Sequence, residues 1–228
     1  MRLTHKRSVF HFDYTLGNSI LQTTNSHPYL GVTITDKLTW NKHIDNITAS
    51  ANRTLGFIRR NLYSCPQHVK ESAYKTLVRP LVEYSSSTWD PYTQVLNNKL
   101  EMVQRRAARF VSGDYKSKSQ GCMTELLRQL DWESLQSRRK CRRLTILQKA
   151  ITGHLSLPVG KLLQPAPRTS RHTNSQAFAT LAATKDCYKN SYLPRTIRDW
   201  NSIPDSIAKR QEPNTFKAAI ASHIYKQD

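Results

Sequence analysis

The stretch LEMVQRRAARFV, residues 100–111, places three arginines within five positions of a segment that is otherwise apolar. At about 100° per residue, Arg105, Arg106 and Arg109 fall on one side of a helix and the apolar residues on the other. The apolar side carries Leu100, Val103, Ala107, Phe110 and Val111. Such a basic face either keeps a core helix solvated or contacts an anionic partner, and the rest of the chain must distinguish the two.

The charge balance of the chain favours an anionic partner. The 228 residues include 35 Lys and Arg against 16 Asp and Glu, a formal net charge of +19 with a pI near 10.1. An excess of this size is typical of proteins that neutralise phosphates, so nucleic acid is the leading candidate and an anionic membrane surface the second. With 38% hydrophobic residues, the chain also has enough apolar material for a buried core.

The sequence predicts neither a membrane span, nor a secretory signal, nor a disulfide framework. No apolar run approaches the roughly 20 residues needed to span a bilayer, and MRLTHKRSVF at the start lacks the apolar region of a secretory signal. We therefore expect no membrane span and an intracellular location, nuclear or cytoplasmic. Cys65, Cys122, Cys141 and Cys187 form no CxxC pair, which predicts reduced thiols rather than disulfides or a zinc finger.

The first forty residues read as strands. VFHFDYT (residues 9–15) and SILQTT (residues 19–24) flank a turn at Gly17 and Asn18, and YLGVTIT (residues 29–35) follows Pro28 as a third strand. This pattern predicts a small antiparallel sheet. A three-stranded ribbon has little core of its own and needs another element to pack against.

From residue 41 the apolar period becomes helical. We expect Asn41 to cap the first helix, Pro80 to kink or end the second, Gly113 to stop the helix of the opening stretch, and Asp131 to cap a helix that ends at Gly153. The first predicted helix covers residues 41–62, and the second is opened by a capping box of Ser64 and Gln67, with Pro66 in its first turn, and extends to 81. The others are the segment ending at 111, a short helix around 126–130, residues 132–152 and a last helix through 216–224.

The predicted fold class is α+β, mainly α, in three regions. Residues 1–40 form the sheet, residues 41–153 a helical bundle, and residues 154–228 a smaller α-rich segment. The second boundary is placed where Pro- and Ser/Thr-containing loops begin. Within the last region we expect Trp200, between Ile197 and Ile203, to anchor a core.

A second basic stretch, RRKCRR, occurs in the helix predicted over residues 132–152. Its five cations in six residues must wrap around the helix, a density that predicts phosphate contact, with nuclear import as the alternative. They are Arg138, Arg139, Lys140, Arg142 and Arg143. Together with the three arginines of residues 100–111 and the loop residues Lys116 and Lys118, they form a predicted phosphate-binding cluster between residues 105 and 143.

No catalytic or metal site is predicted. Two-metal phosphoryl transfer needs clustered carboxylates, whereas the acids here are dispersed. Asp131 and Glu133 are better explained by helix capping, and Glu83 and Asp90 flank a turn that they could support by hydrogen bonding. The sequence also lacks a Gly-rich phosphate loop, a GxSxG elbow and an HExxH motif. We expect this chain alone to bind no cofactor.

Six strings, in order along nearly the whole chain, resemble the carboxy-terminal part of LINE-like, non-LTR retrotransposon reverse transcriptases. They are YLGVTITDKLTWNKHIDNI (29–47), FIRRNLYSCP (57–66), AYKTLVRPLVEYSSSTWDP (73–91), LEMVQRRAARFV (100–111), LDWESLQSRR (130–139) and YLPRTIRDWNSIP (192–204).

The resemblance implies specific roles. The YLGV string corresponds to the primer-grip region, which would place Tyr29 and Gly31 near the primer 3′ end, and the helices that follow resemble the thumb and post-polymerase segment. Their basic residues would then clamp RNA or RNA–DNA template–primer duplex. The alternative without a functional role is that YLGV forms an ordinary buried strand, in which Gly31 lets another part of the chain approach its backbone closely. The family's YxDD box and its divalent metals belong upstream of Met1, so the expectation is a truncated enzyme that holds duplex without polymerising.

Two alternatives stay open at this stage. One is a cellular basic interaction module, or a pseudogene product, whose basic helices are merely solvated. The other is an incomplete gene product, whose full form carries the polymerase.

Overall fold

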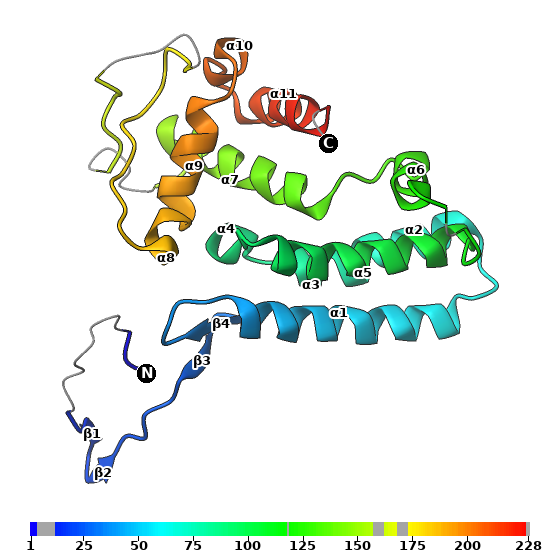
Figure 1. Ribbon diagram of the computed structural model, residues 1–228, viewed down its shortest axis with the longest axis horizontal. Helices are drawn as coiled ribbons and strands as arrows, with labels where there is room; N and C mark the ends of the chain where they lie inside the picture. Colours follow the sequence, from blue (N-terminus) through cyan, green and yellow to red (C-terminus); the bar gives the residue numbers. More distant parts are fainter. Residues whose placement is uncertain (4–11, 118, 157–161, 168–172, 227–228) are drawn as a thin grey trace.

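The structure is a computed structural model that describes residues 1–3, 12–117, 119–156, 162–167 and 173–226 (Figure 1). Helices dominate the described residues, whose strands all lie in the N-terminal part, and this confirms the predicted α+β, mainly α class. Lys118 and the first residues of the strand predicted over 9–15 lie outside the described residues.

The strands form two separate hairpins rather than one sheet of three strands. In the first, β1 (Thr15–Leu16) pairs with β2 (Ser19–Ile20) across the predicted turn at Gly17 and Asn18. In the second, β3 (Ser26–Tyr29) pairs with β4 (Val32–Thr35). The single strand predicted over residues 29–35 is wrong, because Leu30 and Gly31 have φ of 46° and 79° and form a tight two-residue turn.

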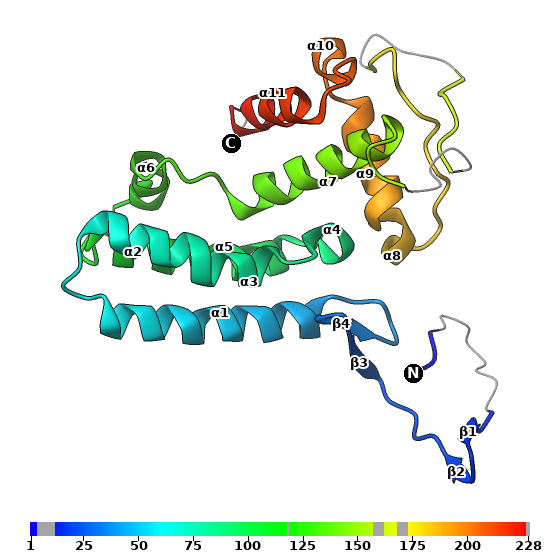
Figure 2. The same ribbon diagram turned by 180° about the vertical axis from the view of Figure 1, so that it is seen from behind.

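The first helices stack in layers between the hairpins and the C-terminal region (Figures 1 and 2). The outermost layer is α1 (Asn41–Asn61), the next contains α2 (Gln67–Ala73), α3 (Arg79–Glu83), α4 (Ser86–Trp89) and α5 (Gln94–Ser112), and beyond it lie α6 (Cys122–Gln129) and α7 (Leu135–Ile151).

The described part of the C-terminal region contains four helices, α8 (Asp186–Lys189), α9 (Tyr192–Asn201), α10 (Asp205–Ala208) and α11 (Pro213–Tyr225). Two of them, α9 and α11, pack against α7 (Figure 1). The final helix through Phe216, Ile220 and Ile224 is thereby confirmed, and all three side chains are buried.

Two predicted caps differ from the structure. Asn41 is the first residue of α1, and Trp40 occupies the cap position without a side-chain hydrogen bond. Asp131 does not cap α7: it adopts φ of 52° in the preceding turn, and Ser134 accepts a hydrogen bond from the Ser137 N–H at 3.0 Å. A serine hydroxyl directly before the helix reaches that free N–H, whereas Asp131 lies too far upstream. Gly113, at φ of 75°, ends α5 as predicted.

The helix that contains Pro80 does not end there. A π-helical segment, η1 (Tyr74–Val78), joins α2 to α3, and the helix continues to Glu83. A π-helical segment changes the hydrogen-bond ladder locally, so the missing N–H of Pro80 is accommodated without stopping the helix.

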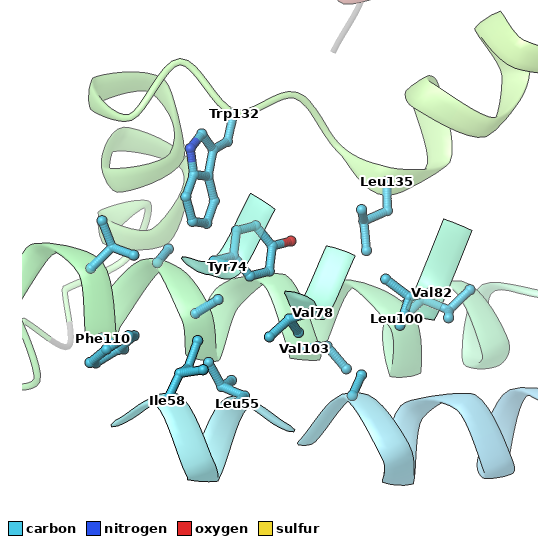
Figure 3. Packing of buried hydrophobic residues seen from close by; sticks show 14 of the residues in the cluster. Leu55, Ile58, Tyr74, Val78, Val82, Leu100, Val103, Phe110, Trp132 and Leu135 are labelled. Atoms are coloured by element: carbon cyan, nitrogen blue, oxygen red, sulfur yellow. The ribbon is translucent and has the colours of Figure 1, made fainter. Parts of the chain in front are cut away.

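Two apolar clusters form the core, and they meet on α7. The first lies between α1, the α2–α3 segment and α5, and it includes Leu135 at the start of α7 (Figure 3). The second contains Cys141, Leu144 and Leu147 of α7 together with the C-terminal helices. Trp200 is buried in it, as predicted. The cores therefore divide within α7, ahead of the boundary predicted near Gly153.

Candidate nucleic-acid interface

The arginines of α7 are engaged inside the protein. Arg139 Nε donates to Asp90 Oδ1 at 2.7 Å, and Arg143 Nε donates to Asp90 Oδ2 at 2.9 Å. Both arginines are only 1% exposed. Arg139 also donates to Asn97 Oδ1 at 2.7 Å, and Arg143 to Asp199 Oδ2 at 2.9 Å. Beyond their shared partner Asp90, Arg139 therefore connects α7 to α5 and Arg143 connects α7 to α9.

Glu83 engages the other two arginines of α7. Arg138 Nε donates to Glu83 Oε1 at 2.5 Å, and Arg142 Nη1 donates to the Glu83 carbonyl at 2.5 Å. From α9, Arg195 reaches the Asp90 carbonyl at 2.9 Å, and its burial lowers the pKa of Arg195 while Asp90 opposes this. The turn between Glu83 and Asp90 is thus the acidic counterpart of the RRKCRR stretch.

The phosphate-binding role predicted for this stretch is wrong for Arg139 and Arg143. A buried guanidinium that already holds two carboxylates or amides cannot reach a ligand at the protein surface. Arg138 and Arg142 are less buried, but their charge is compensated by Glu83. Lys140 alone forms no ion pair with an acid of the described residues. Spacing explains the outcome: residues four apart share one side of a helix, and each such pair of arginines meets one acid.

The arginines of α5 separate into different roles. The apolar side of α5 is buried as predicted. Arg105 is exposed, and Arg106 Nη1 donates to Asn52 Oδ1 of α1 at 3.0 Å. Arg109 is only partly exposed and donates to the carbonyls of Asp114 and Ser117, at 3.3 and 3.0 Å. Arg109 therefore holds the loop after α5.

Helices α1 and α5 run side by side in the same direction. Lys99 pairs with Asp45 at 2.7 Å, and seven residues further along both helices Arg106 meets Asn52. This register brings the end of α1 next to the loop after α5. There the guanidinium of Arg59 lies 5.5 Å from the ring centroid of Tyr115.

An open hollow at this end of the two helices is basic and aromatic. It is lined by Gly56, Arg59, Arg60, Tyr63, Phe110 and Tyr115. Tyr63 and Tyr115 are 75% and 46% exposed. Sequence analysis missed Arg53, Arg59 and Arg60 of α1, all exposed. On the helical wheel Arg53 and Arg60 lie opposite the apolar side of α1, which could have revealed them, and Arg59 lies at its edge.

Lys116 lies in the loop beside this hollow. Its side chain is exposed, while its backbone N–H and that of Ser117 donate to Asp114 Oδ1 at 3.0 Å each. The hydrogen bonds from Ser117 lower the pKa of Asp114, so the carboxylate remains charged and holds the turn. Lys116 is therefore presented on an ordered loop.

The β3–β4 hairpin, which carries Tyr29 and Gly31, lies at the opposite end of α1 (Figure 1). Tyr29 is 62% exposed, so the buried-strand alternative is wrong for it. A Cβ on Gly31 would lie 3.1 Å from Cε1 of Tyr84, whose hydroxyl donates to the Leu30 carbonyl at 3.3 Å. Since the 21 residues of α1 span about 30 Å, these two residues do not share a site with the hollow.

The structure gives further findings on metals, membranes and thiols. Across the described residues, no group of three or more His, Cys, Asp and Glu is arranged to hold a metal ion. None of the described helices is long and apolar enough to cross a membrane. Cys65, Cys122, Cys141 and Cys187 form no disulfide with one another.

No protein-family model, curated protein or solved structure matches this chain. The resemblance to non-LTR reverse transcriptases therefore stays a prediction.

Proposed function

We propose that this protein binds the phosphate backbone of RNA or RNA–DNA duplex through one face, the α1–α5 basic surface. This surface is defined by Arg53, Arg59, Arg60, Arg105, Arg106 and Lys116. One difference between the two basic regions supports this proposal. The α7 arginines form ion pairs with Glu83 and Asp90, whereas these six side chains form no ion pair with any acid of the described residues.

The chemistry of this surface supports a backbone-directed mode of binding. Each cation that contacts a phosphate releases condensed counterions, so affinity comes from charge and depends steeply on salt. The exposed rings of Tyr63 and Tyr115 beside Arg59 add faces on which an unpaired base can stack. The surface therefore suits a duplex that ends in, or adjoins, a short single-stranded segment.

The resemblance gives this proposal its context. We propose that α1 to α7 correspond to the thumb and post-polymerase part of a non-LTR retrotransposon reverse transcriptase, the part that holds template–primer. We propose no polymerase chemistry for residues of this chain: Glu83 and Asp90, the buried acids of the described residues, are both held by arginines.

The proposal is tested by the salt dependence of duplex binding. A labelled RNA–DNA duplex is titrated with the wild type and with the double variant Arg59→Gln/Arg60→Gln at several salt concentrations. We expect the slope of log affinity against log salt to fall by about 1 to 2, since each neutralised phosphate contributes about 0.9.

The matched control removes the same charge elsewhere. Arg198 and Arg210 are exposed arginines of the C-terminal region, and Arg198→Gln/Arg210→Gln should leave the slope unchanged. If both double variants lower the slope equally, or if the wild type is held on heparin as well as on duplex, the chain is a basic interaction module with a merely solvated surface.

A further inference from the structure

The hollow at the end of α1 and α5 is lined on its α1 side by a residue that has no side chain. Gly56, Arg59, Arg60 and Tyr63 are spaced three and four residues apart, so they follow one side of α1 and of the turn after it. Gly56 leaves helix backbone uncovered beside the two arginines. The hollow measures about 740 Å³, a volume within the range of small-molecule sites.

Neither the backbone nor the packing of α1 requires a glycine at position 56. Gly56 lies inside the helix and has no positive φ. Among the described residues outside the helix backbone, a Cβ at Gly56 would meet only Arg60 Nη1, at 3.6 Å, which is ordinary contact with the end of a flexible side chain. Glycine destabilises a helix interior relative to alanine. The structure of α1 thus gives no reason for this glycine, and what Gly56 provides is open space in the hollow.

Two of the rings that line the hollow are open to a ligand. Tyr63 and Tyr115 are 75% and 46% exposed. The backbone around Tyr115 is already fixed, since Arg109 donates to the Asp114 carbonyl and Asp114 Oδ1 accepts from the Lys116 N–H. A planar ligand therefore finds this wall in place, which lowers the entropy cost of binding.

The charge of the hollow specifies what the planar ligand is attached to. Of the six lining residues, Arg59 and Arg60 are cationic and none is acidic. Lys116 adds an exposed cation in the adjoining loop. An uncharged aromatic compound would leave these charges without a counter-charge. A nucleotide supplies both parts, a base for the tyrosine rings and a phosphate for the guanidinium groups.

We propose that the hollow binds one unpaired nucleotide at the end of a duplex, with its base over the Gly56 backbone and against Tyr63 and Tyr115, and its phosphate at Arg59 and Arg60. This inference rests on the proposed function, because the α1–α5 basic surface must hold the adjoining duplex. It goes further in giving a single base its own site, so that the protein distinguishes an overhanging strand end from a blunt one. Stacking uses the face of the base, so binding should tolerate any sequence.

The test compares three RNA–DNA duplexes of the same length that differ at one end. The first is blunt, the second carries one unpaired adenosine, and the third carries one abasic nucleotide, which keeps the phosphate and removes the base. We expect the wild type to bind the adenosine end about tenfold more tightly than the abasic end, in line with the stacking of one base on an aromatic side chain. The abasic end should bind almost like the blunt one.

Two variants locate this preference in the hollow. Tyr63→Ala removes an exposed ring, and Gly56→Leu fills the open space with a residue that favours helices. Both should bind the adenosine and abasic ends alike, and both keep the charge, so their salt slope on the blunt duplex should equal that of the wild type. Thermal unfolding should show Gly56→Leu to be no less stable than the wild type. The control Tyr188→Ala removes a tyrosine of α8 that is 48% exposed, and it should keep the tenfold preference.

The outcomes separate this inference from duplex binding itself. If the wild type binds the adenosine and abasic ends equally and its salt slope is steep, the hollow holds no base and only the duplex-binding proposal stands. A preference that survives in both Tyr63→Ala and Gly56→Leu places the base elsewhere and also overturns the inference. If the wild type binds none of the three duplexes, both proposals fail.

Discussion

Arg139 donates to Asp90 across 2.7 Å in the interior of the protein, where their side chains are 0% and 4% exposed. Asp90 accepts from Arg143 as well, and Arg195 lies 3.4 Å from it. The Asp90 carboxylate therefore lies among three guanidinium groups, from α7 and α9, at the junction of the two apolar clusters, and Asp199 supplies a second negative charge to Arg143. The two apolar clusters are therefore connected by buried ion pairs at their junction.

The first prediction concerns removal of this carboxylate. In Asp90→Asn the buried arginines lose their main counter-charge, and breaking a buried ion pair from one side costs about 3–5 kcal/mol. We expect the free energy of unfolding, measured by urea denaturation, to fall by about this amount.

The control for this prediction is Asp45→Asn. Asp45 pairs with Lys99 at a similar distance, 2.7 Å, but both side chains are about half exposed. Exposed ion pairs contribute about 0–1 kcal/mol, so this variant should unfold almost like the wild type. If both variants lose the same free energy of unfolding, burial is not the reason that the Asp90 network stabilises the protein.

The role of this network could not be predicted from the sequence. RRKCRR reads as a ligand-binding stretch because its charge is visible locally, whereas its partners Glu83 and Asp90 lie about fifty residues away and look like ordinary turn residues. Only the packing of α7 against the α3–α5 segment brings them together. A local pattern shows how many charges a helix carries, and the tertiary fold decides which of them remain free.

Features that depend on neighbouring residues were predictable. The helical period of residues 100–111 identified the buried side of α5, and the Gly17–Asn18 turn identified the first hairpin. The second hairpin was missed because Leu30 precedes Gly31 in a turn that needs two positive φ angles, and leucine rarely adopts one. The pairing of β3 with β4 fixes the backbone of this turn, and residue propensities along the sequence do not predict that pairing.

A second prediction concerns the stack of Tyr74 on Trp132 (Figure 3). Their ring centroids lie 4.4 Å apart, and Trp132 Nε1 donates to Glu71 Oε1 at 2.9 Å. Trp132→Ala opens a cavity in the first core and should cost about 3–5 kcal/mol. Trp132→Phe keeps a stacking ring and should cost clearly less. Denaturation of both variants measures the difference, and equal losses would mean that the hydrogen bond to Glu71, rather than packing, dominates.

A third prediction concerns the protonation of His43. Nδ1 accepts a hydrogen bond from the Thr33 N–H at 3.1 Å, so the imidazole is neutral with its proton on Nε2, and burial lowers the pKa of His43. The unfolded state then binds a proton more readily than the folded state below the ordinary pKa of 6.5. The contribution of His43 to stability is therefore complete above that pH and is lost as the pH falls.

This pH dependence is measured as a difference between proteins. Unfolding is followed from pH 7.5 to 5 in the wild type and in His43→Asn, whose side-chain oxygen can still accept from Thr33. Other titrating groups, including Glu101, whose pKa is raised by burial, contribute equally to both and cancel. We expect the wild type to lose more stability over this range than the variant. Parallel curves would contradict the assignment of a neutral His43.

The last prediction separates two arginines that a helical wheel places together. Arg109 donates to two loop carbonyls, whereas Arg105 is exposed. Hydrogen bonds from a charged donor contribute about 1.5–3 kcal/mol, so Arg109→Gln should lower the free energy of unfolding by about this amount and Arg105→Gln by less than about 0.5 kcal/mol. Duplex binding should depend on Arg105 instead. We expect Arg105→Gln to lower the salt slope of duplex binding without unfolding the protein, because the charge of Arg105 is available to phosphate. If Arg109→Gln is as stable as Arg105→Gln, the loop that carries Tyr115 and Lys116 is not held by Arg109, and the hollow beside it has no fixed wall on that side.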